Sequence, residues 1–333
     1  MRTVSALLLS IALLVPLASA EDAPPSVALL KEGRALFDAK KFDEARTVFE
    51  RAAAAGEQEK DPGAVVEGLA LAARTFIAAD RLEEAKPWLD KAEKLAKPDA
   101  PLGWSTFLAV RGRLRWKEKN FEEARKDFEA AYGFCHEKGL PERAIDAANM
   151  MTFVSPLEQQ PTWARKGIEA AERGRLDGWL GPLWNNLGAA HEEAGRYAEA
   201  LEAYLKAREY HWKVGKEPGK LAADWAIGHT HRLLGDARKA ATWLRPVLAW
   251  AERLLAEGSF AEAGEWVGLA AKDLGQAIAM DGRASEGLAL LVRARPHLEA
   301  AKMAEWDAKG WKELLAEIER LGASAAPPPP GMR

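Results

Sequence analysis

Hydrophobic and polar positions along this chain follow the period of a helix, and the same pattern returns about every forty residues. The first of three columns in this pattern is a small residue, at spacings of 40, 39, 40, 36, 40 and 47 residues: Ala45, Ala85, Ala124, Ala164, Ala200, Ala240 and Gly287. Four residues later stands an apolar column: Phe49, Leu89, Phe128, Ile168, Tyr204, Leu244 and Leu291. Twelve residues before the small residue stands a glycine-rich column: Gly33, Ala73, Gly112, Thr152, Gly188, Gly228 and Gly275. The shared register predicts seven repeating units.

Each unit is expected to be a helix, a turn and a second helix. Turn-forming pairs separate two helical periods at Gly195-Arg196, Gly235-Asp236 and Gly282-Arg283. No window has the strict alternation of a strand, so the fold class is all-α. A plain helical bundle also has amphipathic helices, but it does not repeat glycine, alanine and aromatic positions at one fixed period. The pattern therefore favours an array of stacked helix pairs.

One stretch of the fifth unit has a more specific motif. It has the form W-x2-L-G-x2-H from Trp184, followed by A-x3-Y from Ala200. This resembles the tetratricopeptide repeat (TPR), whose pattern is W-x2-L-G-x2-Y and then A-x3-F. The longer period of about 40 residues instead of 34 is similar to that of kinesin light chains and related peptide-binding scaffolds. The resemblance implies a right-handed α-α superhelix, or TPR solenoid, with a groove along its concave face.

The pattern divides the chain into an array with flanking segments. A short linker at 21–27 precedes the array at 28–321, and a disordered, proline-rich tail follows at 322–333, with Pro327–Pro330 inside it. A helix around Glu305–Leu321 with Trp306 and Trp311 is expected to cap the last unit. The units and the cap are expected at about 26–63, 64–100, 104–140, 141–175, 181–218, 219–257, 260–297 and 298–321.

Residues 1–20 have the pattern of a secretory signal peptide. Arg2 provides the positive end, Ala6–Leu17 the apolar core, and Ala18–Ala20 the small residues of a cleavage site. An uncleaved membrane anchor is the alternative, but the apolar core is shorter than the roughly 20 residues that span a bilayer. We therefore expect cleavage after Ala20 and a periplasmic or secreted protein.

Composition and charge narrow the function classes. The chain has 47 basic and 50 acidic residues, and this balance argues against nucleic-acid binding through the whole surface. Cys135 is the single cysteine, so no intramolecular disulfide forms, and a lone cysteine in an apolar helix is usually a buried hydrophobic residue.

Searches for catalytic and cofactor motifs find no candidates. The sequence lacks G-x-S-x-G, H-E-x-x-H, C-x-x-C, G-x-G-x-x-G and a glycine-rich phosphate loop. His229 and His231 lie two residues apart, which on a helix points their rings about 200° apart and prevents them from sharing a metal ion. We therefore expect no enzyme activity, no cofactor and no metal site.

The TPR resemblance implies which residues line the groove. If the glycine-rich column is the eighth position of a repeat, the ninth positions of units one to three are Arg34, Arg74 and Arg113. Guanidinium groups bind carboxylates through two hydrogen bonds, so this arginine row is a candidate site for an acidic segment. The alternative is that acids such as Glu67 or Asp38 neutralise the row internally.

The fifth and sixth positions supply the other candidates. Asn149, Asn185 and Asn186 occupy them, and an amide both donates and accepts hydrogen bonds, as binding to a peptide backbone requires. Hydrogen bonds between helices of the array are the alternative. Trp225 is a candidate anchor for a peptide or a sugar ring, although core packing is the more common role of tryptophan.

These observations predict a non-catalytic scaffold that binds an extended, acidic peptide or protein tail on its concave face. Two alternatives remain open. One is an envelope glycan-binding module that uses Trp116, Trp225 and other aromatic residues. The other is a structural, self-assembling protein that uses the C-terminal Trp306/Trp311 helix. The partner, and the oligomeric state, are not specified by the sequence.

Overall fold

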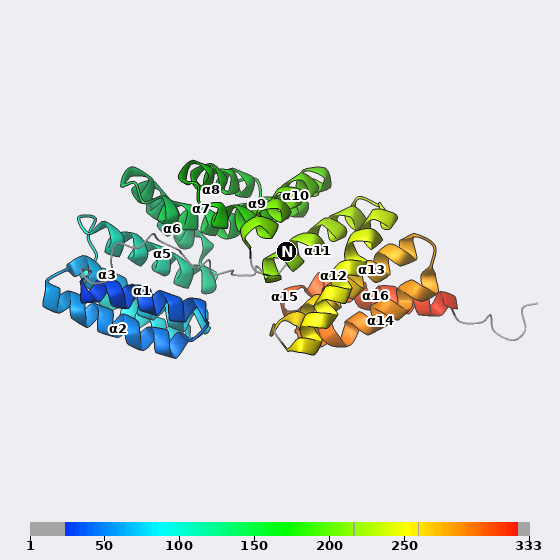
Figure 1. Cartoon of the computed structure of the whole chain (residues 1–333), viewed down its shortest axis with the longest axis horizontal. Coiled ribbons are helices and arrows are strands. Elements are labelled where there is room, and N and C mark those ends of the chain that lie inside the picture. The colour runs from blue at the N-terminus through cyan, green and yellow to red at the C-terminus, as the bar shows by residue number, and fades with distance from the viewer. Residues whose placement is uncertain (1–23, 216, 259, 326–333) are drawn as a thin grey trace, which may run out of the picture. The chain divides into compact units, whose positions relative to one another are not determined.

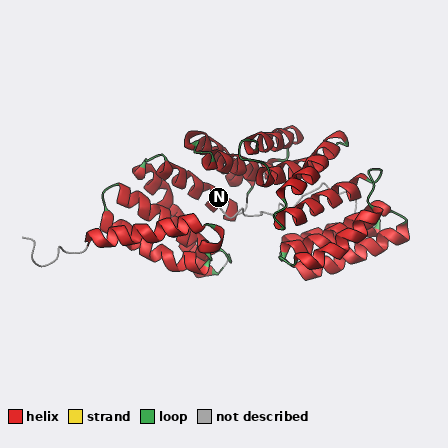
Figure 2. Cartoon of the chain, turned by 180° about the vertical axis from the view of Figure 1, so that it is seen from behind, coloured by secondary structure: helices red, strands yellow, loops and turns green. Residues whose placement is uncertain are grey.

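The computed structural model describes residues 24–215, 217–258 and 260–325, which contain sixteen helices and no strand (Figures 1 and 2). This confirms the all-α prediction. The expected signal peptide, residues 21–23 of the linker and residues 326–333 of the tail lie outside the described residues. None of the described helices is both long and apolar enough to cross a bilayer.

The helices follow one another as seven pairs and a short C-terminal segment. The pairs are α1 (Pro25–Asp38) and α2 (Phe42–Glu59), α3 (Pro62–Ala78) and α4 (Leu82–Leu95), α5 (Pro101–Lys117) and α6 (Phe121–Glu137), α7 (Pro141–Val154) and α8 (Gln160–Gly174), α9 (Asp177–Glu193) and α10 (Tyr197–Val214), α11 (Glu217–Leu233) and α12 (Ala237–Glu257), and α13 (Ala263–Met280) and α14 (Ala284–Ala300). The C-terminal segment contains α15 (Met303–Trp306) and α16 (Ala308–Ala325).

The described helices form two compact units along the chain. The N-terminal unit ends at Trp179 and contains α1 to α8, coloured blue to green in Figure 1. The C-terminal unit begins at Leu180, inside α9, and continues to the end of α16. Within each unit the second helix of one pair packs against the first helix of the next, as α2 does against α3 and α12 against α13.

The three sequence columns form the contact between the two helices of a pair. In the fifth pair, a Cβ atom added to Gly188 would lie 2.6 Å from the ring of Tyr204. In the third pair, the equivalent atom on Gly112 would lie 2.8 Å from the ring of Phe128. Every residue of the apolar column is buried, and the alanines of the small column have 0% exposure. In the pairs with glycine in this column, the two helices therefore approach too closely for a side chain on the first helix.

In every pair except the fourth, the turn between the two helices uses a residue with positive φ. Gly195, Gly235 and Gly282 have this conformation in pairs five to seven, at the turns predicted from the sequence. Lys40, Asp80 and Lys119 adopt it in the first three pairs, although they are not glycine. A side chain in the left-handed region costs about 1 kcal/mol, so these three turns depend on the helices on either side.

The C-terminal segment differs from the single helix expected over 305–321. The helix is interrupted at Asp307, whose Oδ1 accepts a hydrogen bond of 2.9 Å from the backbone N–H of Gly310. Asp307 thereby caps α16, as a short acidic side chain does at a helix start. The helix then continues to Ala325, into the segment expected as tail, and α1 begins at Pro25, inside the expected linker. Proline is favoured in the first helical turn, which explains the earlier start.

The close helix crossing predicts opposite effects for one substitution at two glycines. Gly188→Ala adds a methyl group against Tyr204, and we expect it to lower the free energy of unfolding by about 1–3 kcal/mol. Gly133→Ala lies on the exposed side of α6 with no atom within 4 Å of the added Cβ. It should raise that free energy by about 0.5–1 kcal/mol. Urea denaturation followed by circular dichroism measures both, and equal effects would refute a tight crossing.

Candidate functional site

The predicted arginine row lies on successive first helices of the N-terminal unit. Arg34 is on α1, Arg74 on α3 and Arg113 on α5. The three are close enough to affect one another. Burial and the charges of Arg113 and Arg34 lower the pKa of Arg74 to about 10, although the nearby carboxylates Asp146 and Asp38 act in the opposite direction. The structure thus brings these three predicted residues together, and their role in binding remains a prediction.

The first arginine of the row has a buried partner. Arg34 forms an ion pair with Glu67 on α3, whose side chain is 3% exposed. The same carboxylate accepts hydrogen bonds from Arg143 at 2.5 Å and from the Thr106 hydroxyl at 3.2 Å. Burial alone would raise the pKa of Glu67, but the attraction of Arg143 and Arg34 outweighs it and lowers that pKa.

The third arginine is also paired. The Arg113 guanidinium donates a hydrogen bond of 2.6 Å to Asp146 on α7 and another of 3.1 Å to the carbonyl of Ala109. Burial would raise the pKa of Asp146, yet Arg113 and Arg74 lower it. Internal neutralisation, which we considered as the alternative, therefore describes the two outer arginines.

The middle arginine has no such partner. Both acids lie 33 residues after the arginine that they bind and six residues before the glycine-rich column of their own unit. In the unit after Arg74 that position is Thr106, whose hydroxyl accepts a hydrogen bond from Arg143. Within the described part of the chain, the Arg74 guanidinium forms no ion pair or hydrogen bond and lies 4.8 Å from the centre of the Phe37 ring. Arg74 is therefore a half-buried cation without a counter-ion in contact.

The predicted asparagines have different environments. Asn149 on α7 and Asn186 on α9 take part in interactions within the structure. Asn185 on α9 is half-buried, and its side chain has no hydrogen-bond partner among the described residues. Asn185 therefore retains the free amide that backbone recognition requires, whereas the other two already have partners.

Trp225 on α11 lies in the packed interior of the C-terminal unit. Its side chain is 5% exposed, stacks on His229 at 4.8 Å between ring centres, and meets Trp266 edge to face at 5.8 Å. This is the core role that we weighed against ligand anchoring. The indole N–H is buried and has no hydrogen-bond partner in the described residues.

A buried polar cluster around His229 was missed by the sequence analysis. It joins Glu192 on α9, His229 and Arg232 on α11, and Asp273 on α13. Asp273 has 0% exposure although it stands within the apolar run Val267–Ile278. A charged pair inside such a run, here Lys272 and Asp273, was the available signal, because a buried acid requires partners.

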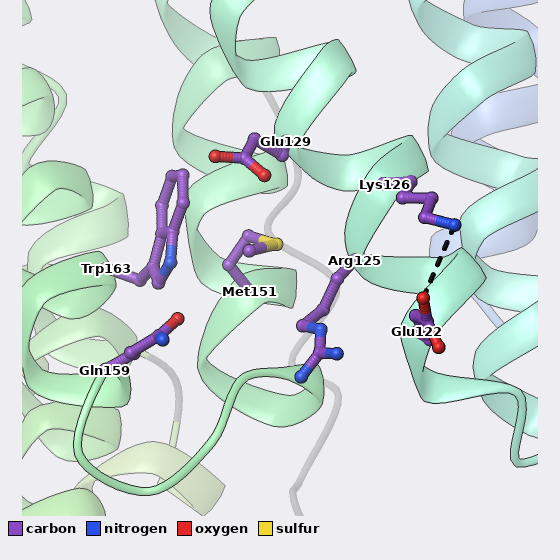
Figure 3. A pocket seen from close by; sticks show the side chains of 7 residues that line it. All are labelled: Glu122, Arg125, Lys126, Glu129, Met151, Gln159 and Trp163. Carbon is purple, nitrogen blue, oxygen red and sulfur yellow. Dashed lines mark ion pairs between the residues drawn. The ribbon is translucent and has the colours of Figure 1, made fainter.

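A shallow depression lies on the N-terminal unit between α6, α7 and α8 (Figure 3). Trp163, Met151 and Gln159 line one side and Arg125 another, while Lys126 pairs with Glu122 at 3.5 Å. Its volume of about 240 Å³ is below the range of about 300–1,000 Å³ typical of small-molecule sites. The described residues also contain no group of three or more potential metal ligands.

Comparisons with known proteins agree with the helix pairs. The tetratricopeptide-repeat family profile matches residues 181–211. A search of the curated proteins finds no significant match. Among solved structures, the fold is similar to a STAND (Signal Transduction ATPase with Numerous Domains) protein with a tetratricopeptide repeat sensor from Pyrococcus horikoshii. That match has 15% identity and a TM-score of 0.67, and it covers 87% of this chain but only 44% of that one.

Two further structures are similar over most of both chains. The apo form of RapI has 13% identity and a TM-score of 0.66, with 90% of this chain and 86% of that chain covered. NprR in complex with its cognate peptide NprX has 13% identity and a TM-score of 0.53, with 89% and 81% covered. At identities this low, the matches establish a likeness of the fold alone.

The pairing of Glu67 predicts a stability effect that depends on pH. Glu67→Gln removes the charge that Arg34 and Arg143 share, and we expect a loss of about 1–3 kcal/mol of unfolding free energy at neutral pH. Because the folded pKa of Glu67 is lowered, this contribution is present above its usual pKa of 4.5 and is lost as pH falls through the folded value. Wild type and variant should therefore converge in acid.

Urea denaturation between pH 3 and pH 7 measures the convergence. Glu83→Gln is the matched control, because Glu83 pairs with Lys86 on the surface and its side chain is 83% exposed. It should have little effect at any pH. A constant difference between wild type and Glu67→Gln over the whole range would contradict the assigned pairing.

Proposed function

We propose that this chain, which matches the tetratricopeptide-repeat profile at residues 181–211, is a non-catalytic scaffold that binds an extended segment of another protein. The match at residues 181–211 contains the motif that begins at Trp184, and the helix pairs have the TPR arrangement. Arrays of this kind expose rows of side chains on successive helices, which suit an extended ligand better than a compact one. No cofactor or nucleic acid is part of this proposal.

The observation that carries the proposal is the unpaired Arg74. Its pKa of about 10 still leaves the guanidinium protonated at neutral pH, so the half-buried charge persists without a counter-ion in contact. A buried or partly buried charge is stabilised when a carboxylate supplies hydrogen bonds and opposite charge. An acidic group on a bound segment would supply both.

The surroundings of Arg74 indicate what else the segment contains. Glu67 and Asp146 are already bound by their own arginines, so a second acid of the ligand would meet negative charge on either side. Phe37 offers an aromatic ring beside the cation. We therefore propose a segment with one acidic group near Arg74 and apolar or neutral residues around it. Micromolar affinity corresponds to about −8 kcal/mol.

The likeness to NprR supports the class of ligand, because that fold was solved with a cognate peptide bound. The aromatic residues give less support to the glycan alternative, since Trp225 is 5% exposed and Trp116 is half-buried. The self-assembly alternative gains no support from the cap either. Trp306 and Trp311 pack against the core of the C-terminal unit, and the Trp306 indole donates to the carbonyl of Ala301.

Export is part of the proposal and rests on residues 1–20 of the sequence alone. We propose a periplasmic or secreted scaffold in which cleavage follows Ala20. Mass spectrometry of the N-terminus after expression with a secretion system would show a chain beginning at Glu21. An intact Met1 in the membrane fraction would contradict cleavage.

Two substitutions test Arg74 from opposite directions. Arg74→Gln removes the cation, and Thr106→Asp places an acid where the neighbouring units have one, so that Arg74 gains an internal counter-ion. Both should weaken binding of the acidic segment about 10- to 100-fold, the usual effect of losing a charge-assisted hydrogen bond. Arg125→Gln is the control, because Arg125 is a half-buried arginine on α6 outside this row.

The measurement has two stages. Mature protein captures partners from an envelope extract, which mass spectrometry identifies, and calorimetry then measures the affinity of the captured segment for each variant. Circular dichroism must show that the variants remain helical. Equal capture by wild type, Arg74→Gln and Thr106→Asp would overturn the proposed site.

A further inference from the structure

A chain of polar contacts crosses the interior of the C-terminal unit, with His229 at its centre. The imidazole Nδ1 lies 2.9 Å from Asp273 Oδ2 on α13, and Nε2 lies 3.4 Å from Glu192 Oε1 on α9. One side chain on α11 thus contacts carboxylates on the first helices of the preceding and following pairs.

The two carboxylates differ in their other partners. Asp273 also accepts a hydrogen bond of 2.9 Å from Arg232 and lies 3.7 Å from Lys272. Among the described residues, Glu192 has one other polar contact, a hydrogen bond of 3.2 Å that it accepts from the hydroxyl of Tyr204 on α10. Within this part of the chain His229 is therefore the cation at Glu192, whereas Asp273 has cations besides His229.

The protonation state of the ring decides how many of these contacts it makes as a donor. A protonated imidazole has two N–H groups and donates to Asp273 and Glu192 together. A neutral imidazole has one N–H and a lone pair, so it donates to only one carboxylate. Arg232 Nη2 lies 3.2 Å from Nδ1 and can only donate, which favours a neutral ring with its lone pair at Nδ1 and its N–H toward Glu192. Side-chain exposures of 12%, 11% and 0% for His229, Glu192 and Asp273 leave little water to compensate.

We propose that His229 is a proton-operated tie between α9 and α13, closed when the ring is protonated and open when it is neutral. Asp273 is the carboxylate that the neutral ring releases, because Arg232 can then donate to Nδ1 and, with Lys272, still neutralises Asp273. Opening the tie removes the charge that links Glu192 on α9 to Asp273 on α13, and it weakens the cation's contact with the stacked Trp225 ring.

The pH range in which the tie opens follows from the groups around His229. Burial would lower the pKa of His229, but the charges of Asp273 and Glu192 outweigh burial and raise it above 6.5. The stabilisation is therefore complete below about pH 6.5 and is lost as pH rises through the higher folded value. Two other histidines of the unit are shifted in the opposite direction, since burial lowers the pKa of His211 to about 4 and also lowers that of His231.

The tie has a consequence for binding that rests on the proposed function. Asn185, a predicted contact position, lies on α9, one of the two helices that the proton joins. A partner that used Asn185 would bind more weakly above this pH range. The test below measures the tie without any partner, so failure of the tie and failure of the binding proposal are distinguishable.

The first measurement is an NMR titration of the histidine rings in the mature chain between pH 5 and pH 10. The His229 resonance, assigned by its loss in His229→Gln, should titrate above 6.5. Glu192→Gln should move its midpoint downward while leaving Asp273 and Arg232 in place. A ring that titrates at or below 6.5, or a midpoint unchanged by Glu192→Gln, would overturn the proposal.

The second measurement compares urea denaturation at pH 6 and pH 9. His229→Gln should be destabilised relative to wild type at pH 6, and the ratio of their unfolding constants should shrink at pH 9. Each unit by which the folded pKa is raised corresponds to about a tenfold change in this ratio. His231→Gln is the matched control: because the pKa of His231 is lowered, its stability relative to wild type should change with pH in the opposite direction. If His229→Gln fails to fold, Glu192→Gln serves in its place, and a ratio that does not change with pH refutes the tie.

Discussion

The structure depends on how closely the two helices of each pair can approach one another. At Gly33, Gly112 and Gly188 the first helix has no side chain, and an aromatic ring from the second helix occupies the space beside it. This contact sets the crossing of the pair, and the crossing determines which face of the first helix is turned away from the second. The rows of charged and polar residues on the first helices are therefore a consequence of a packing constraint at glycine.

The two units differ in how their buried charged side chains are paired. In the N-terminal unit, arginines reach forward to an acid of the next first helix, and this arrangement leaves Arg74 without a partner. In the C-terminal unit, the buried acid Asp273 has several cations and an imidazole connects it to Glu192. The N-terminal arrangement leaves one cation without a counter-ion in contact, whereas the charges of the C-terminal arrangement connect helices.

Much of the fold was accessible from the sequence because the repeated columns report directly on helix crossing. The arginine row was accessible as well, since Arg34, Arg74 and Arg113 each follow the glycine-rich column by one residue. Which of them is paired depends on a residue of the next unit, and only the structure shows that Glu67 and Asp146 fill this role.

Other features had no repeating signal. The interruption of the helix at Asp307 depends on one capping hydrogen bond. An acidic residue inside a helical sequence pattern does not by itself predict such a cap. The cluster around His229 combines residues from different positions of three units, so no column contains it. Trp225 occupies a predicted groove position but is buried, because two neighbouring rings cover it.

The unpaired state of Arg74 belongs to a junction between repeats and not to any one repeat. Unit two has an arginine like those of its neighbours, and unit three is ordinary apart from Thr106. If unit three were exchanged with a unit that has an acid at that position, the free cation would disappear without a change in unit two. The order in which similarly folded modules follow one another thus decides which charges are paired, and exchanging whole modules can create or remove the proposed binding position with no new side chain.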